Sequence, residues 1–170
     1  RSFVQANEQM MPTLYQTLVS HLDWKGDGTL IDLYCGIGLL TMILAKTGGT
    51  VIGVDDNKSA IEDATMNAKN NQLTIDFICQ KAETFLGDYD CSDSVLVMDP
   101  PRQGCHPSVL RSIIQAAPKL IGIISCHADS LGRDLRLLVD GGYDINSIQG
   151  VEMFPHSVHL EMVVCLRLRM

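Results

Sequence analysis

The chain has 170 residues and a formal net charge of −7, with 46% hydrophobic and 19% charged residues. This length suits one domain with a substantial core, and this composition excludes a disordered chain. The acidic balance argues against phosphate binding over the whole surface, so a nucleic-acid partner requires a local basic patch or another domain.

The six cysteines stand at positions 35, 79, 91, 105, 126 and 165, and no two of them have C-x-x-C spacing. This argues against a zinc ribbon and against a thioredoxin-like site. No apolar run approaches the roughly 20 residues that span a bilayer, and no signal-peptide pattern is found. We therefore expect a cytoplasmic protein with free thiols.

Helix-like and strand-like segments alternate along the first half of the chain. Residues 10–22 are predicted to form a helix because their apolar residues recur at helical spacing. The elements that follow are a strand over 29–34, a helix from Leu39 closed by Gly48 or Gly49, a strand over 50–56, a helix over 58–71 with Asn57 as N-cap, and a strand over 74–79.

The alternation continues in the second half. Its predicted elements are a strand over 94–101, a helix from Pro107 that Pro118 helps to stop, a strand over 120–126, a helix carrying Leu131, Leu135 and Leu138 that ends at Gly141, and strands over 143–149 and 159–170. Apolar residues of the last segment alternate with a period of two, as in a strand.

This order predicts an α/β, Rossmann-like fold: a mostly parallel seven-stranded sheet with helices on both faces. No helix joins the two closing strands, so they are expected to form an antiparallel pair at one edge. Ligands of such sheets bind beyond the carboxyl ends of the strands. Asp32, Asp55, Asp99 and Cys126 all stand at such ends, which makes them candidate site residues.

The segment DLYCGIGLLT (32–41) has the pattern of a glycine loop between a strand and a helix. Gly36 and Gly38 let the backbone approach a ligand closely. A dinucleotide fingerprint would need a third glycine at position 41, where threonine stands. Asp55 is placed to bind ribose hydroxyls or to cap a turn. The acidic Asp32 suits the cationic groups of S-adenosylmethionine (SAM), which we favour here over a nicotinamide cofactor.

The segment DPPRQGC (99–105) follows the fourth predicted strand. Its two prolines stiffen the turn that carries Asp99, and Arg102 adds a positive charge. D-P-P is also typical of methylases that act on exocyclic amino groups. Those enzymes usually have an aromatic residue next, and Arg102 in its place argues against that chemistry.

Together these motifs resemble a known family. DLYCGIG, GVD, DPPRQG, ISC and MFPHSVHLEMV occur in the order expected of SAM-dependent RNA uracil-5-methyltransferases, and SFVQAN (2–7) is similar to the family's F-x-Q-x-N segment. The resemblance covers nearly the whole chain, so residues 1–170 are expected to form a single catalytic domain. Family members usually carry RNA-binding and central domains on the N-terminal side, which would supply basic surface.

The resemblance implies residue roles. Cys126 matches the nucleophile that adds to carbon 6 of uracil, and Glu161 matches the base that removes the proton from carbon 5. Asp99 matches a residue at the SAM and pyrimidine end of the pocket, and the SAM-contact positions are Gln5, Tyr34 and Asp55. We assign Arg102 and His127 to the substrate side, where either could stabilise a thiolate at Cys126. The implied substrate is tRNA or rRNA.

The family chemistry needs no metal. A metal site formed by His156, His159 and Glu161 is the alternative, but residues three apart on a strand point to opposite faces, which argues against it. Three positions depart from the family pattern: His127-Ala128 replaces Asn-Pro, Leu39 replaces a common Asn, and Lys81 stands where a small polar or acidic group often meets adenine. Two other hypotheses therefore stay open: a non-catalytic RNA- or SAM-binding module, and direct methyl transfer to an amino group with Cys126 inert.

Overall fold

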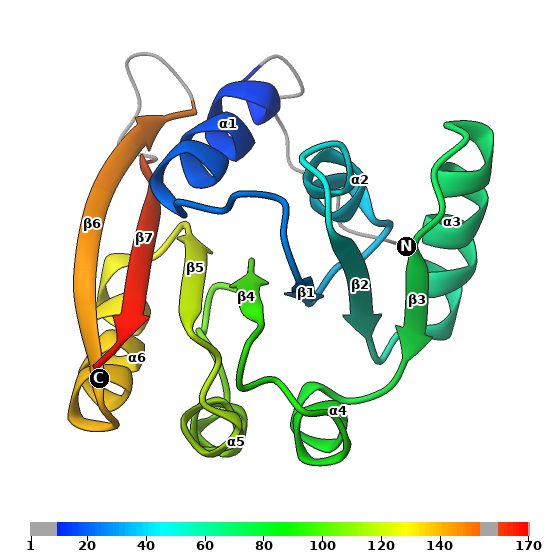
Figure 1. Cartoon of the computed structure of the whole chain (residues 1–170). Coiled ribbons are helices and arrows are strands. Elements are labelled where there is room, and N and C mark those ends of the chain that lie inside the picture. Colours follow the sequence, from blue (N-terminus) through cyan, green and yellow to red (C-terminus); the bar gives the residue numbers. More distant parts are fainter. Residues whose placement is uncertain (1–9, 154–159, 170) are drawn as a thin grey trace.

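A computed structural model describes residues 10–153 and 160–169 of the chain. Within these residues, one seven-stranded sheet is covered by helices on both faces (Figure 1). One face carries α1 (Met11–His21), α2 (Leu39–Ala45) and α3 (Lys58–Asn70), and the other carries α4 (Ala82–Asp88), α5 (Pro107–Ala116) and α6 (Ala128–Asp140).

The strand order is β3-β2-β1-β4-β5-β7-β6. The strands are β1 (Thr29–Leu33), β2 (Thr50–Asp55), β3 (Asp76–Cys79), β4 (Val95–Met98), β5 (Leu120–Ser125), β6 (Tyr143–Glu152) and β7 (Leu160–Leu168). The first five pair in parallel, and β7 runs antiparallel to both β5 and β6. The predicted α/β fold with an antiparallel edge is confirmed.

Alternation along the strands divides the core into two layers. Ile31 and Leu33 of β1 pack in the layer that holds α4, α5 and α6, whereas Leu30 packs with Leu14 and Leu18 of α1. Successive side chains of a strand point to opposite faces, so each strand serves both layers. The same alternation decides which residues at the strand ends meet.

Some elements differ from expectation. Helix α2 ends at Ala45, before Gly48 and Gly49. A side chain at Gly49 would lie 2.6 Å from Trp24, so this glycine is required by packing rather than by the helix end. Strand β4 stops at Met98, because the prolines that follow Asp99 have no N–H to donate. The seven-residue helix α4 was not predicted, since one short buried face gives too little periodicity.

The expected N-cap of α3 is confirmed. Asn57 caps α3, with its Oδ1 accepting the Ser59 N–H at 3.0 Å. All six cysteines are free thiols. Among residues 10–153 and 160–169, no helix is long and apolar enough to cross a membrane.

Candidate active site

Several predicted site residues lie on the α1–α2 face of the sheet, at the carboxyl ends of their strands or, for Glu161, near the start of β7. Alternating core residues set this face: Leu30 before Asp32, Val97 before Asp99, and Val163 after Glu161 all pack in the α1 layer. In β5, a side chain at Gly122 would lie 2.7 Å from Leu18 of α1. The same alternation carried on from Ile124 assigns Cys126, which is exposed, to this face.

Tyr15 of α1 lies over these groups and was not singled out from the sequence. It is 5% exposed, and burial raises the pKa of its hydroxyl, with further contributions from the charges of Asp99, Asp32 and Glu161. Three carboxyl groups from different strands therefore surround one tyrosine. Its spacing from Met11 and Leu18 is that of an ordinary core residue, so the sequence held no separate signal.

Cys126 and Glu161 come from neighbouring antiparallel strands. Ser125, the last residue of β5, pairs with Met162 of β7. Continued by one residue beyond this last pair, the register would set Cys126 opposite Glu161. Residues directly opposite in an antiparallel pair have Cβ atoms about 4.5–5.5 Å apart. A thiol and a carboxyl group at this spacing can both reach one flat pyrimidine ring.

The carboxyl group of Glu161 lies in a poorly solvated place. The residue is 9% exposed, and its Oε2 atom is buried without a hydrogen-bond partner among the described residues. Burial raises the pKa of Glu161, and the positive charge of Arg102 opposes that rise. A buried carboxylate with a free acceptor atom is suited to take a proton from a bound substrate.

Asp32 is buried beneath the glycine loop. Its Oδ2 accepts a 2.6 Å hydrogen bond from the Thr41 hydroxyl, at the position where a dinucleotide fingerprint would have glycine. Burial raises the pKa of Asp32 to about 7; the Thr41 bond opposes the rise, and the charges of Asp99 and Asp55 add to it. A bound cation would favour the ionised carboxylate.

This pKa predicts a pH-dependent stability. Because the folded-state pKa of Asp32 is raised from 3.8 to about 7, its contribution to stability is full below pH 4 and is lost as pH rises through 7. At pH 8 and without ligand, we expect Asp32→Asn to unfold at a higher urea concentration than the wild type. Its free energy of unfolding should be larger by at most about 4 kcal/mol.

The difference in the free energy of unfolding between Asp32→Asn and the wild type should become smaller toward pH 5, as measured by urea titrations between pH 5 and 8. Asp76→Asn, at an exposed carboxylate of β3, is the matched control and should show no such trend. A stability difference for Asp32→Asn that stays constant with pH would contradict the assignment.

The two glycines of the loop, Gly36 and Gly38, have different surroundings. A side chain at Gly38 would lie 2.8 Å from Phe77, so this glycine, with φ +81°, lets β3 and α3 pack closely. At Gly36, with φ +53°, an added Cβ would meet nothing within 4 Å. The Gly36 N–H donates to Asp55 Oδ2 at 2.9 Å. The loop thus presents open space beside an oriented carboxylate, which fits a ribose-bearing ligand.

Asp55 also has the turn-capping role considered above, since its Oδ1 accepts the Asn57 N–H at 2.9 Å. Each carboxylate oxygen can accept more than one hydrogen bond, so both roles are compatible. Its charge acts on Asp32, which places the two carboxylates in one neighbourhood.

Some predicted residues lie elsewhere. The half-buried Tyr34 side chain packs in the α4–α6 layer, where burial and its neighbour Cys105 raise its pKa, so a ligand contact there would fall to its main chain. His127 caps α6: its Nδ1 accepts the Ser130 N–H at 3.4 Å. Gln5, His156 and His159 lie outside the described residues.

Leu39 and Lys81, two of the three departures from the family pattern, have plain surroundings. Leu39 is the first residue of α2 and is 37% exposed, and Lys81 is the exposed residue before α4. Within the part of the chain that the structure describes, no group of three His, Cys, Asp or Glu residues could hold a metal ion.

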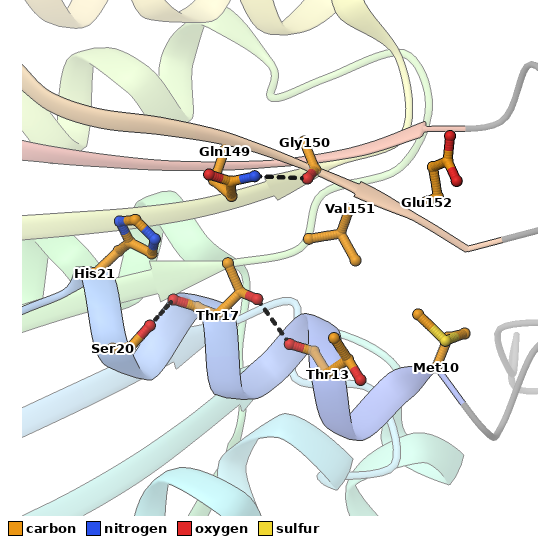
Figure 2. A pocket seen from close by; sticks show the side chains of 9 residues that line it. All are labelled: Met10, Thr13, Thr17, Ser20, His21, Gln149, Gly150, Val151 and Glu152. Atoms are coloured by element: carbon orange, nitrogen blue, oxygen red, sulfur yellow. Dashed lines mark hydrogen bonds between the residues drawn. The ribbon is translucent and has the colours of Figure 1, made fainter.

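A groove of about 500 Å³ lies between α1 and β6 (Figure 2). It adjoins the site, because Val151 of β6 pairs with Glu161. Two hydroxyl groups drawn in Figure 2 donate within α1, Thr17 to the Thr13 carbonyl at 2.8 Å and Ser20 to the Thr17 carbonyl at 2.9 Å. These donors already have partners, and we assign no ligand to the groove.

The sheet order and the glycine loop define the class of protein. The structure resembles magnesium protoporphyrin IX methyltransferase from Synechocystis, solved with bound SAM, over 95% of this chain and 79% of that chain, with a TM-score of 0.72. At 16% identity this likeness shows the fold alone. The fold is that of the SAM-dependent methyltransferases.

Residues 1–169 match the family described as tRNA (Uracil-5-)-methyltransferase, and the chain belongs to this family. An RNA methyltransferase of Listeria innocua is 39% identical over 99% of this chain and 38% of its own length, and one from Bacillus cereus is 38% identical over 98% and 37%. The chain thus spans less than two fifths of these relatives.

A solved relative agrees. The Pyrococcus abyssi tRNA (uracil-54, C5)-methyltransferase, in complex with S-adenosyl-L-homocysteine, has a TM-score of 0.82 and 29% identity over 98% of this chain and 40% of that chain. The family indicated by the ordered motifs is confirmed.

Proposed function

We propose that this chain methylates carbon 5 of a uridine in RNA, with Cys126 as nucleophile and Glu161 as general base. The observation that carries the proposal is the β5–β7 register: it ends at the Ser125–Met162 pair, and the residues adjoining that pair are Cys126 on one side and Glu161 on the other. Membership of the uracil-5-methyltransferase family supports the choice of base and carbon atom.

The first step overcomes the low reactivity of carbon 5. The thiolate of Cys126 adds to carbon 6 of uracil, so that a sulfur–carbon bond forms and the double bond between carbons 5 and 6 opens. The electron pair moves through carbon 5 to the carbonyl oxygen at carbon 4 as an enolate. SAM, when bound, would supply the methyl group: the enolate electron pair would form the bond from carbon 5 to the methyl carbon, and the broken sulfur–methyl bond would leave S-adenosylhomocysteine.

The second step releases the product. The carboxylate of Glu161 takes the proton from carbon 5, and the electrons of that carbon–hydrogen bond restore the double bond. The sulfur–carbon bond breaks, and Cys126 leaves as a thiolate. The raised pKa of Glu161 supports this role, because a weaker acid has a more basic carboxylate.

The remaining residues are assigned by position. Asp32, Gly36, Gly38 and Asp55 would hold SAM around the glycine loop, joined by the main chain of Tyr34 and by Gln5. Asp99 would lie at the SAM and pyrimidine end of the pocket; its charge contributes to the raised pKa of both Tyr15 and Asp32, which supports a place near them. Arg102, whose charge acts on Glu161, would contact the base or its phosphate.

We also propose that these 170 residues act as a catalytic domain whose RNA contacts are completed by surfaces outside it. The net charge of −7 is a poor match for an RNA backbone. The relatives matched here are more than twice as long, which leaves room for such surfaces. Both tRNA and rRNA fragments are therefore needed as test substrates.

The test uses RNA that contains 5-fluorouridine. Fluorine cannot be removed as a proton, so the proposal predicts a complex of protein and RNA, formed with SAM, that survives a denaturing gel. Mass spectrometry of the digested complex should identify Cys126 as the linked residue.

Other outcomes select the competing functions. SAM binding without adduct or methyl transfer, on tRNA and rRNA alike, would indicate a binding module. Methylated product without any adduct would indicate direct transfer, with Cys126 inert.

A further inference from the structure

Two loops carry the predicted substrate-side groups, and helix α6 joins them. The loop of residues 99–105 follows β4 and carries Asp99 and Arg102, whereas the β5–α6 turn carries Cys126 and His127. The hydroxyl of Ser130 lies 2.9 Å from the Arg102 carbonyl oxygen and 3.1 Å from that of His127. Its single proton goes to one carbonyl at a time, and the Ser130 N–H donates to His127 Nδ1 at 3.4 Å, so this one residue links both loops.

A buried carboxylate strengthens this junction. Asp134 is 3% exposed, and its Oδ2 accepts the Cys105 N–H at 2.7 Å. Its Oδ1 accepts two bonds from Arg133, at 3.0 Å from Nε and 2.7 Å from Nη2. Arg133 Nη2 also donates to the Gln103 carbonyl at 2.8 Å. Charge-assisted bonds of this kind are shorter and stronger than neutral ones.

The sequence of the loop is fitted to this contact. Gly104 has φ +79°, and a Cβ added there would lie 2.5 Å from both Arg133 Nη2 and Asp134 Oδ2. Only glycine lets the loop approach α6 so closely. Ser130, Arg133 and Asp134 are spaced i, i+3 and i+4, so they present one helix face to the loop.

We propose that Ser130, Arg133 and Asp134, here named the α6 clamp, are positioning residues that hold the loop of residues 99–105 at a set distance from Cys126. This inference rests on the proposed function, because it concerns a base held between Asp99, Arg102 and the thiol. The clamp touches main-chain atoms of residues 102, 103 and 105, so it places Arg102 without using that side chain.

The clamp has an electrostatic consequence. Arg102 opposes the rise in the pKa of Glu161, and the Arg102 carbonyl is held by Ser130. A loop that moves away takes this positive charge with it. The pKa of Glu161 then rises further, and the acidic limb of the pH–rate profile moves to higher pH. A defect in stability alone would not shift that limb.

The test compares Ser130→Ala and Ser130→Thr, which restores the hydroxyl, in the full chain with RNA and SAM. Ser108→Ala is the matched control: Ser108 also follows a histidine N-cap, with its Oγ 2.7 Å from His106 Nδ1, but it lies on α5. Asp134→Asn is the second clamp variant, because it keeps an acceptor for Cys105 while losing the charge that pairs with Arg133.

We expect Ser130→Ala to lower kcat by about 10- to 100-fold, since small displacements of reacting groups have effects of this order. The Kd for S-adenosylhomocysteine should change less than about twofold, and the acidic limb should move to higher pH. Ser130→Thr should recover most of the wild-type kcat. Asp134→Asn should also lower kcat and move the acidic limb to higher pH, whereas Ser108→Ala should match the wild type.

The clamp is refuted if Ser130→Ala keeps the wild-type adduct rate and pH profile, or if Ser108→Ala loses as much rate. If Ser130→Ala does not fold, Asp134→Asn decides by the same criteria. In all these cases the wild type still forms its adduct on 5-fluorouridine RNA. A wild type that forms no adduct overturns the proposed function, and the clamp with it.

Discussion

Cys126→Ala is expected to lower methyl transfer to RNA by on the order of 10⁴-fold or more, the scale seen when an enzyme loses its nucleophile. Without sulfur at this position nothing opens the double bond of uracil, and carbon 5 stays unreactive. Binding of S-adenosylhomocysteine, measured by calorimetry, should stay near the wild-type value. The glycine loop and Asp55 lie on β1 and β2, away from β5.

The matched control for this variant is Cys79→Ala. Cys79 is the other exposed thiol of the chain, and it ends β3 at the far edge of the sheet. It should transfer methyl groups and form the adduct as the wild type does. Methylation by Cys126→Ala within about tenfold of the wild-type rate would remove the covalent mechanism and favour direct transfer.

Glu161→Gln should form the covalent complex and fail to resolve it. The amide has the shape of the acid but cannot take the proton from carbon 5, and general-base losses of this kind cost about 10²- to 10⁴-fold. On unmodified RNA, the variant should accumulate a denaturation-resistant complex in which the base already carries the methyl group. The wild type should show none at steady state.

Glu152→Gln is the control for this second variant, because Glu152 is an exposed carboxylate on the neighbouring strand β6. It should release product normally. On a denaturing gel, Cys126→Ala and Glu161→Gln should have opposite effects on the amount of covalent complex: Cys126→Ala abolishes the complex, whereas Glu161→Gln makes it persist. Normal turnover by Glu161→Gln would take the role of base away from this residue.

The fold could be predicted from the sequence because each strand and most helices carry their own signal. Alternating apolar runs, the Asn57 cap and the absence of a helix between the last two strands were enough to give the sheet and its antiparallel edge. Helix α4 was missed because it is too short for its buried residues, Ala82, Phe85 and Leu86, to form a recognisable helical repeat. Local pattern succeeds where an element is long enough to repeat.

The candidate site was predictable only in part. Strand ends marked Asp32, Asp99 and Cys126, and motif order supplied Glu161. Tyr15 was missed, because a buried tyrosine on a helix has the same spacing whether it packs in a core or covers a site. Thr41 was noticed only as a missing glycine, although its hydroxyl bonds to Asp32.

The α6 clamp was missed for a different reason. Its contacts join positions about 28 to 30 residues apart, such as Ser130 with Arg102 and Arg133 with Gln103. No local pattern in either segment indicates the other. Such long-range contacts depend on how α6 packs beside the loop after β4, which only the three-dimensional structure reveals.

The position of β7 between β5 and β6 has a consequence for how the enzyme is made. The strand is synthesised after both of its neighbours, since ribosomes build the chain from its N-terminal end. A nascent polypeptide that ends after β6 therefore contains the proposed nucleophile, Cys126, but lacks Glu161, and β6 has no neighbouring strand to pair with until β7 is added. Under the proposed mechanism, the site is complete only once β7 has inserted between β5 and β6. A chain without β7 has no residue 161 to take the proton from carbon 5, so it could not release a pyrimidine bound covalently to Cys126.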